Sequence, residues 1–173
     1  MLIELPPLWL VCADVLAWLI IHLGVAWAGT QLAPERFEPA SWLYRQRAWE
    51  RNGGVYESFF RIKGWKDWLP DGASWFSGGF RKATVSARDP VYLERFVRET
   101  CRGEAVHWTV AAAAVLFFVW NPWPVGLGMI VYAAAANIPC IIAQRYNRIR
   151  LLRVLARANR QSATDKTLSP DNV

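Results

Sequence analysis

A glutamate and a histidine stand three positions apart at the start of an apolar stretch, as Glu104 and His107. Side chains at i and i+3 share one face of a helix, so a carboxylate at this spacing can hold an imidazole in one tautomer and raise its basicity. A general base needs such an arrangement. We therefore predict that His107 is a catalytic base held by Glu104. In the structural alternative, Glu104 is interfacial and His107 bonds a neighbouring helix.

Four further polar or reactive residues interrupt the apolar blocks. Asn137 lies in the run AAAANIPC, where small alanines let another helix approach and bond the amide; a substrate contact is the alternative. Asp14 and His22 lie in the first block, where ionisable groups are functional candidates by default, and structural roles are equally open. Cys140 is a rival nucleophile, although apolar surroundings disfavour its thiolate.

A dense arginine cluster follows the last apolar block, in QRYNRIRLLR at residues 144–153. Most such runs stop membrane translocation and bind anionic lipid. Because the guanidinium fork matches phosphate oxygens, the cluster also predicts a phosphate clamp that includes Arg145, Asn147 and Arg148. Nucleic-acid binding is not expected, since the basic residues adjoin apolar blocks and follow no known recognition module.

Separate apolar and charged blocks indicate that these residues belong to a membrane protein. The chain is 54% hydrophobic and carries a net charge of +6, and its charges stand apart from its apolar runs. The first block, residues 8–29, spans roughly 33 Å as a helix, which is enough to cross a bilayer. A cleaved signal peptide is disfavoured, because MLIEL has no basic residue and the apolar run is too long.

Two more apolar blocks, residues 105–120 and 125–144, flank the sequence NPWP. The two prolines remove backbone donors and fix φ, so the chain turns there and the blocks form a helical hairpin. Asn121 is assigned to this turn. The block at residues 105–120 has only 16 residues, which is short for a span. The hairpin is therefore expected to tilt, to thin the bilayer or to be re-entrant.

The distribution of Lys and Arg sets the orientation of the three crossings. Residues 1–35 contain none, residues 36–104 contain 13, and residues 145–173 contain the other 7. By the positive-inside rule both basic regions face the cytoplasm, with the N-terminus and the NPWP turn outside. We therefore predict one all-α membrane domain, 1–173, with a cytoplasmic interfacial segment at 30–104, a hairpin at 105–144 and a basic cytoplasmic tail at 145–173.

Aromatic residues fill the interfacial segment, which distinguishes it from a disordered linker. Trp42, Trp49, Tyr56 and Phe60 recur at helical spacing and predict one face of an amphipathic helix, interrupted near Gly53-Gly54, in the plane of the interface. Residues 73–88 read as a loop. The Asp89-Pro90 pair then predicts a helix that leads into the second membrane block. Three cysteines without CxxC spacing and two histidines predict no disulfide framework, no metal site and no cofactor.

Four stretches carry a resemblance to a known family: RAWERNGGVYESFFRIKGWKDWLPDG at 47–72, ETCRGEAVHW at 99–108, WNPWP at 120–124 and NIPCIIAQRYNRIRLLRVL at 137–155. They resemble the glycosyl-4,4'-diaponeurosporenoate acyltransferases, small bacterial integral membrane proteins. The resemblance implies a protein of the bacterial cytoplasmic membrane. It also implies transfer of a fatty acyl chain to the primary 6-hydroxyl of a sugar on a carotenoid glycoside or a related glycolipid. It brings no established catalytic residue.

The resemblance gives the candidate residues their expected roles. An acyl thioester donor from the cytoplasm would meet a membrane-embedded lipid or glycolipid hydroxyl at the interface, where His107 would remove the proton. Lys63, Lys66 and Arg145 would bind the donor's phosphates or stabilise an oxyanion, and Trp65 and Trp68 would set the depth of the segment. Asn137, Asn147 and Arg148 complete the expected substrate-binding set.

Two other classes of function stay open from the sequence. A non-enzymatic membrane scaffold or lipid-binding protein would use the tryptophans and tolerate changes at Glu104 and His107. A small transporter would need homo-oligomers, because three helices are few for a pathway.

Overall fold

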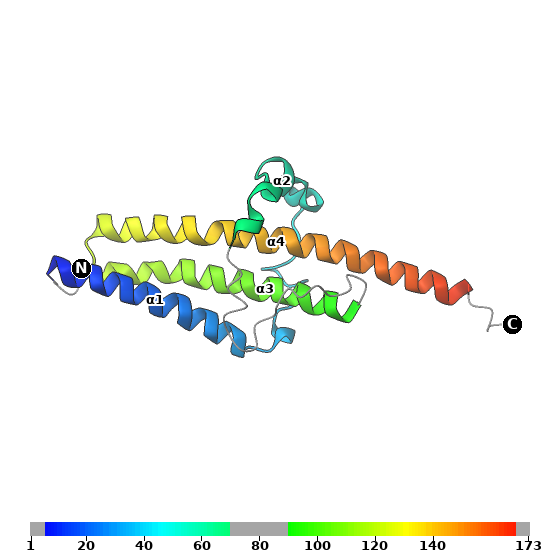
Figure 1. Cartoon of the computed structure of the whole chain (residues 1–173), viewed down its shortest axis with the longest axis horizontal. Coiled ribbons are helices and arrows are strands. Elements are labelled where there is room, and N and C mark those ends of the chain that lie inside the picture. Colours follow the sequence, from blue (N-terminus) through cyan, green and yellow to red (C-terminus); the bar gives the residue numbers. More distant parts are fainter. Residues whose placement is uncertain (1–5, 70–89, 169–173) are drawn as a thin grey trace.

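The computed structural model describes residues 6–69 and 90–168, and every regular element in these ranges is a helix. Its long helices are α1 (Pro7–Gln31), α3 (Pro90–Ala113) and α4 (Trp123–Leu168), and the 3-10 helix η6 (Ala114–Val119) continues α3. Helix α1, the combined α3–η6 segment and helix α4 each have the length and apolar composition needed to cross a membrane. They lie side by side in Figure 1. The predicted all-α membrane fold with three spans is confirmed.

Helix α1 is apolar around its whole circumference, as expected of a helix surrounded by lipid. It begins at Pro7, where the missing N–H costs nothing, and it ends at Gln31, three residues before Pro34. Only Asp14 and Gly29 of this helix are buried in the protein. The exposed side chains are large and apolar, and they include Leu8, Trp9, Val11, Val15, Leu16, Leu19, Ile20, Leu23 and Trp27.

The hairpin forms as predicted, but its first arm is longer than the apolar block. Helix α3 begins at Pro90 and runs with η6 to Val119, so residues 105–120 belong to a segment of 30 residues. The turn follows at Asn121, whose N–H donates to the Phe117 carbonyl at 3.0 Å. The expected helix before the second block is thus present, although Asp89 and the predicted 73–88 loop lie outside the described residues.

Aromatic packing and one close backbone approach hold α1 against the hairpin. The Trp18 ring stacks on Phe117 with centroids 4.5 Å apart and meets the edge of Tyr132 at 5.1 Å. Further along α1, a Cβ atom on Gly29 would lie 2.7 Å from Val106 of α3. Small residues allow this kind of approach between membrane helices. Helix α1 therefore contacts the hairpin at Trp18, through Phe117 and Tyr132, and again at Gly29, through Val106.

Asp14 bonds α1 to the hairpin turn. Its Oδ1 accepts hydrogen bonds from Trp120 Nε1 at 2.8 Å and from Asn121 Nδ2 at 2.7 Å. Both Asp14 and Asn121 are buried. Asn121 is therefore part of the turn, as predicted, and also the partner of an acidic residue inside the first span.

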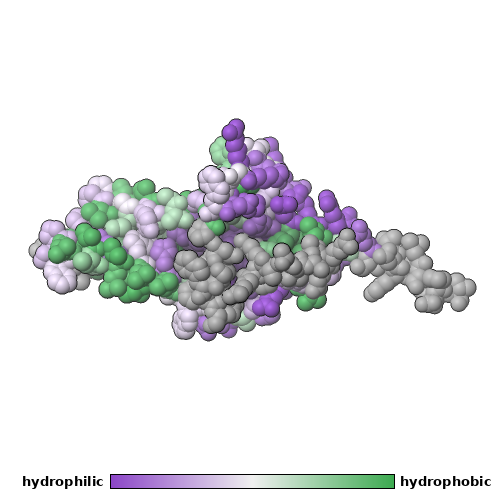
Figure 2. All heavy atoms as spheres, in the orientation of Figure 1, coloured by the Kyte–Doolittle hydropathy of each residue, from purple (hydrophilic) through white to green (hydrophobic). Residues whose placement is uncertain are grey.

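The described part of the segment between α1 and α3, residues 32–69, forms short helices that pack on α3 and α4 away from the hairpin turn. These are η1 (Pro34–Arg36), η2 (Ala48–Gly53), α2 (Gly54–Ser58), η3 (Ile62–Gly64) and η4 (Lys66–Trp68). Tyr56 and Ile62 form a core with Tyr146 and Ile149 of α4, and Figure 1 shows α2 beside the middle of α4. In Figure 2 hydrophilic residues gather over these short helices, and hydrophobic ones gather toward the N-terminal end of α1.

The predicted helical face of this segment was wrong. Arg51, Asn52 and Gly53 have φ of 45°, 55° and 89°, so the chain reverses where a regular helix would continue. As a result Tyr56 is 1% exposed, whereas Trp42 and Trp49 are 71% and 56% exposed and do not share its environment. The segment is helical and aromatic, but it presents separate tryptophans around a folded cap instead of one continuous stripe.

We predict that Asp14→Ala loosens α1 from the hairpin turn. The variant loses two hydrogen bonds to a carboxylate inside a span, which should lower the free energy of unfolding in detergent by about 1–3 kcal/mol. Asp14→Asn keeps an acceptor oxygen and should lose less. The exposed Cys12→Ala on the same helix is the matched control and should unfold like the parent. Equal stability of Asp14→Ala and the control would contradict this role.

Candidate functional site

Four charged side chains form a largely buried, charge-balanced cluster at the end of the hairpin remote from the Asn121 turn. Glu104 of α3 accepts from Arg145 Nη1 at 2.8 Å and pairs through its other oxygen with Arg148, both on α4. Arg145 Nε also donates to Glu50 of η2 at 3.0 Å. Glu104 and Glu50 are 0% exposed, and Arg148 is 2% exposed. Two negative and two positive charges thus compensate each other away from water, as buried charges must.

The Arg145 guanidinium has no N–H left for a substrate. It has five N–H donors, and it makes five hydrogen bonds. Their acceptors are both oxygens of Glu50, Oε1 of Glu104 and the backbone carbonyls of Leu43 and Arg45. In this structure Arg145 instead joins the interfacial segment to the hairpin.

Arg148 is held in the same way, and its half-buried neighbour Asn147 lies between the two arginines on α4. The Arg148 Nε donates to the Tyr44 carbonyl at 3.2 Å, and its guanidinium lies 5.6 Å from the Tyr44 ring centroid. The buried Nη1 has no partner among the described residues. Arg148 is therefore enclosed between α4, Glu104 of α3 and Tyr44, and the phosphate clamp predicted from sequence stays a prediction.

Glu50 also closes the fold of the interfacial segment. Its carboxylate accepts from the Arg47 N–H and from the Tyr56 hydroxyl, in addition to Arg145. Burial raises the pKa of Glu50, but the hydrogen bonds from Arg145, Arg47 and Tyr56 outweigh it, so the pKa lies below its ordinary value. Burial and the bond to Glu50 raise the pKa of the Tyr56 phenol. The carboxylate is thus held in its charged form.

His107 pairs with Asn137 across the hairpin. The distance between His107 Nδ1 and Asn137 Oδ1 is 2.9 Å, and Asn137 Nδ2 donates to the Ala133 carbonyl at 2.9 Å. The predicted pairing of His107 with Glu104 was wrong, because the arginines of α4 engage both oxygens of Glu104. From the sequence, Asn137 and His107 could each bond a neighbouring helix. In the structure these two residues bond each other.

The remaining predicted residues lie apart from this pair, on η3 and η4. Lys63 forms an exposed ion pair with Glu57 at 2.7 Å, and Lys66 pairs with its neighbour Asp67 at 2.7 Å. Trp65 is half-buried against the core of the segment, and its Nε1 donates to the Phe60 carbonyl at 2.8 Å. Trp68 is 86% exposed. Of the two tryptophans, Trp68 alone has the exposure that contact with lipid headgroups needs.

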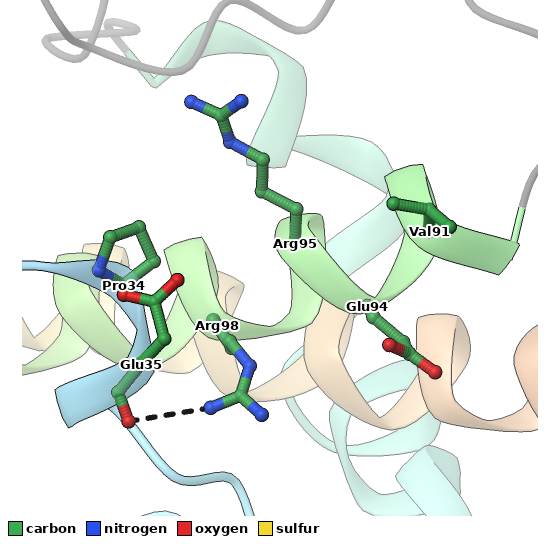
Figure 3. A pocket seen from close by; sticks show the side chains of 6 residues that line it. All are labelled: Pro34, Glu35, Val91, Glu94, Arg95 and Arg98. Carbon is green, nitrogen blue, oxygen red and sulfur yellow. Dashed lines mark hydrogen bonds between the residues drawn. The ribbon is translucent and has the colours of Figure 1, made fainter.

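A surface cavity of about 400 Å³ lies between η1 and the start of α3, lined by Pro34, Glu35, Val91, Glu94, Arg95 and Arg98. Figure 3 shows Arg98 pointing toward Glu35, whose carbonyl accepts from it at 3.4 Å, and Arg95 pointing away. Two acids and two arginines give the lining no net preference for an anion. His107 follows Arg98 by nine residues, about 13 Å along the helix axis. The cavity is therefore separate from the His107 pair.

Sequence reasoning missed Glu50, Tyr44 and the bond between Asp14 and Asn121. The predicted topology contained a signal for the last of these, since it put the start of the first span and the NPWP turn on the same side of the membrane. Glu50 carried no comparable signal, because its partner Arg145 is 95 residues away. Among the described residues no group of three or more His, Cys, Asp and Glu side chains is placed to hold a metal ion.

We predict that the charge cluster stabilises the fold as a unit. Glu104→Leu leaves the Arg148 charge buried without its partner and should lower the free energy of unfolding by about 3–5 kcal/mol. The double variant Glu104→Leu/Arg148→Met removes both charges and should recover part of this loss. Lys63→Ala breaks an exposed pair and should leave the stability nearly unchanged. Strictly additive losses in the double variant, measured by unfolding in detergent, would contradict the coupling.

The lowered pKa of Glu50 predicts how the cluster responds to acid. A carboxyl whose pKa is lower in the folded protein stabilises the fold fully above its ordinary value of 4.5, and this stabilisation is lost as the pH falls through the folded value. The midpoint of thermal unfolding should therefore differ between the parent and Glu50→Gln by a constant amount from pH 7 to about pH 5. Below that pH the difference should shrink. A difference that grows on acidification would show that Glu50 is not held as a carboxylate.

Known proteins match this chain over the part that contains the residues described above. The family model for glycosyl-4,4'-diaponeurosporenoate acyltransferase matches residues 39–157, which include the charge cluster, His107 and Asn137. Proteins of that name from Staphylococcus aureus strains USA300 and NCTC 8325 are 32% identical over 138 residues, 80% of this chain and 83% of theirs. No solved structure matches the chain. The chain therefore belongs to the glycosyl-4,4'-diaponeurosporenoate acyltransferase family.

Proposed function

We propose that this protein is a membrane O-acyltransferase that moves a fatty acyl chain from a thioester donor to a sugar hydroxyl of a carotenoid glycoside or related glycolipid. Its family supports the reaction class. The observation that carries the mechanism is the bond between His107 Nδ1 and Asn137 Oδ1 at 2.9 Å. That bond determines which ring nitrogen can accept a proton.

The tautomer of His107 follows from the acceptors around Asn137. The Ala133 carbonyl can only accept, so the Asn137 NH₂ group must face it, and Oδ1 must face the imidazole. Because Oδ1 can also only accept, Nδ1 of His107 must donate its hydrogen. In a neutral imidazole this leaves the lone pair on Nε2. Asn137 therefore does the positioning that the sequence assigned to Glu104.

The proposed reaction uses this lone pair directly. Nε2 of His107 takes the proton of the sugar hydroxyl as its oxygen attacks the thioester carbonyl carbon. The tetrahedral intermediate collapses, the C–S bond breaks, and the proton on Nε2 passes to the departing thiolate. The products are an ester on the glycolipid and a free thiol, and no cofactor takes part. Cys140 has no step in this scheme.

The position of the pair along the hairpin supports a reaction in the inner leaflet. Asn137 follows Trp123 by 14 residues, about 21 Å of helix, against a hydrocarbon core of about 30 Å. With the N-terminus outside and the C-terminus in the cytoplasm of a bacterial inner membrane, the pair lies just below the inner interface. A donor arriving from the cytoplasm and a glycolipid acceptor can both reach this depth.

We predict that His107→Ala lowers the rate of acyl transfer by about 10²–10⁴-fold, the usual contribution of a general base. Asn137→Ala, which loses only the orienting bond, should lower the rate by about 3- to 30-fold. The assay uses membranes with a carotenoid glycoside and an acyl thioester, and it follows thiol release and the mass gain of one acyl chain on the glycolipid.

Cys140→Ser on the same face of the hairpin is the matched control and should keep the parent rate. If His107→Ala kept the full rate of acyl transfer and Cys140→Ser lost it, Cys140 would be the nucleophile and His107 would not be the general base. Parent membranes that add no acyl chain would favour the scaffold over the enzyme.

A further inference from the structure

Gln144 is a polar side chain next to the His107 pair that the mechanism above does not use. It lies on α4, seven residues after Asn137, and residues seven apart share one face of a helix. Its side chain packs over Gly103 of α3: a Cβ atom there would lie 2.9 Å from Gln144 Nε2 and 3.0 Å from Cδ. The Gln144 amide can occupy this position because Gly103 has no Cβ atom.

The geometry of the hairpin directs this amide and the imidazole toward the same region. Gly103 and His107 are four residues apart and share one face of α3. Helical side chains lean toward the N-terminus of their own helix. Because α3 and α4 run in opposite directions, His107 leans toward Gly103 from one side and Gln144 leans toward it from the other.

Among the side chains that the structure describes, the Gln144 amide has no hydrogen-bond partner, whereas the predicted cationic residues are each held by a carboxylate. Lys63, Lys66, Arg145 and Arg148 are each paired with a carboxylate. Within residues 6–69 and 90–168 no hydrogen bond or ion pair engages the half-buried Gln144 amide. The polar atoms of the Gln144 amide are not fully buried, so a ligand can reach them.

We infer that Gln144 is a further catalytic residue that donates a hydrogen bond from Nε2 to the carbonyl oxygen of the acyl donor. This inference rests on the proposed acyl transfer. When the acceptor oxygen attacks, negative charge develops on the carbonyl oxygen, and a preorganised donor stabilises that charge most strongly away from water. A neutral amide suits this position, because it costs less to bury in the membrane than an unpaired lysine or arginine would. When the C–S bond breaks, the carbonyl re-forms and the hydrogen bond weakens.

Three variants test Gln144. Gln144→Ala should lower kcat by about 10²-fold with little change in KM for the donor, since a typical oxyanion donor contributes about 10²–10³-fold in the transition state. Gln144→Glu keeps the size of the side chain but places an acceptor against the oxyanion, and it should be at least as slow. Gly103→Ala keeps the amide but displaces it, and it should lower kcat by at least tenfold. Gln161→Ala, exposed on the same helix, is the matched control and should keep parent kinetics.

Each outcome decides one question, and all variants are first compared by thermal unfolding in detergent. Gln144→Ala within threefold of the parent kcat would overturn the role of Gln144 while leaving the acyltransferase intact. A rise in KM at constant kcat would also overturn it, because it would indicate ground-state binding alone. If Gln144→Ala does not fold, the Gly103→Ala and Gln144→Glu variants decide by the same criteria. Parent protein that releases no thiol from acyl thioesters would overturn the proposed function, and the inference with it.

Discussion

The buried cluster of Glu50, Glu104, Arg145 and Arg148 is the constraint on which the rest of the structure depends. Taking four charges out of water costs several kcal/mol per ion, and only close, complete pairing offsets that cost. The five hydrogen bonds of Arg145 and the two partners of Glu104 provide such pairing. Any relative displacement of α3, α4 and the interfacial segment would separate charges that have no water to replace their partners.

This constraint fixes the register of the hairpin, and the register places the chemistry. Glu104 and His107 are three residues apart on α3, and Asn137 lies eight residues before Arg145 on α4. Once Glu104 faces Arg145, the antiparallel geometry brings His107, about one turn further along α3, opposite Asn137, about two turns back along α4. A slip of one helical turn would break both contacts together. Charges at the interface thus align neutral polar groups inside the bilayer, where a charge would be far more costly.

The spans and the hairpin could be predicted from sequence because they depend on local signals. Apolar length gives the crossings, and the two prolines of NPWP give the turn. The pairing of Glu104 could not be predicted in this way. The spacing puts His107 on the correct face, but a guanidinium from another helix is a stronger partner for a carboxylate than an imidazole on its own helix. Likewise, the aromatic spacing of residues 42–60 predicted one helical face interrupted near Gly53-Gly54, but it gave no sign that Arg51, Asn52 and Gly53 adopt left-handed conformations and separate those aromatics.

The amides of Asn137 and Gln144 on α4 show why the register matters more than the residue types. Asn137 has its NH₂ group bonded within its own helix, so its oxygen is the atom presented to His107. Gln144 is on the same face two turns later, but there the structure leaves its NH₂ group unbonded over a glycine. The same functional group is therefore an acceptor at one level of the hairpin and is available as a donor at the next. An ester-forming site needs both, because it must orient a neutral base and also stabilise an oxyanion without placing a net charge in the membrane.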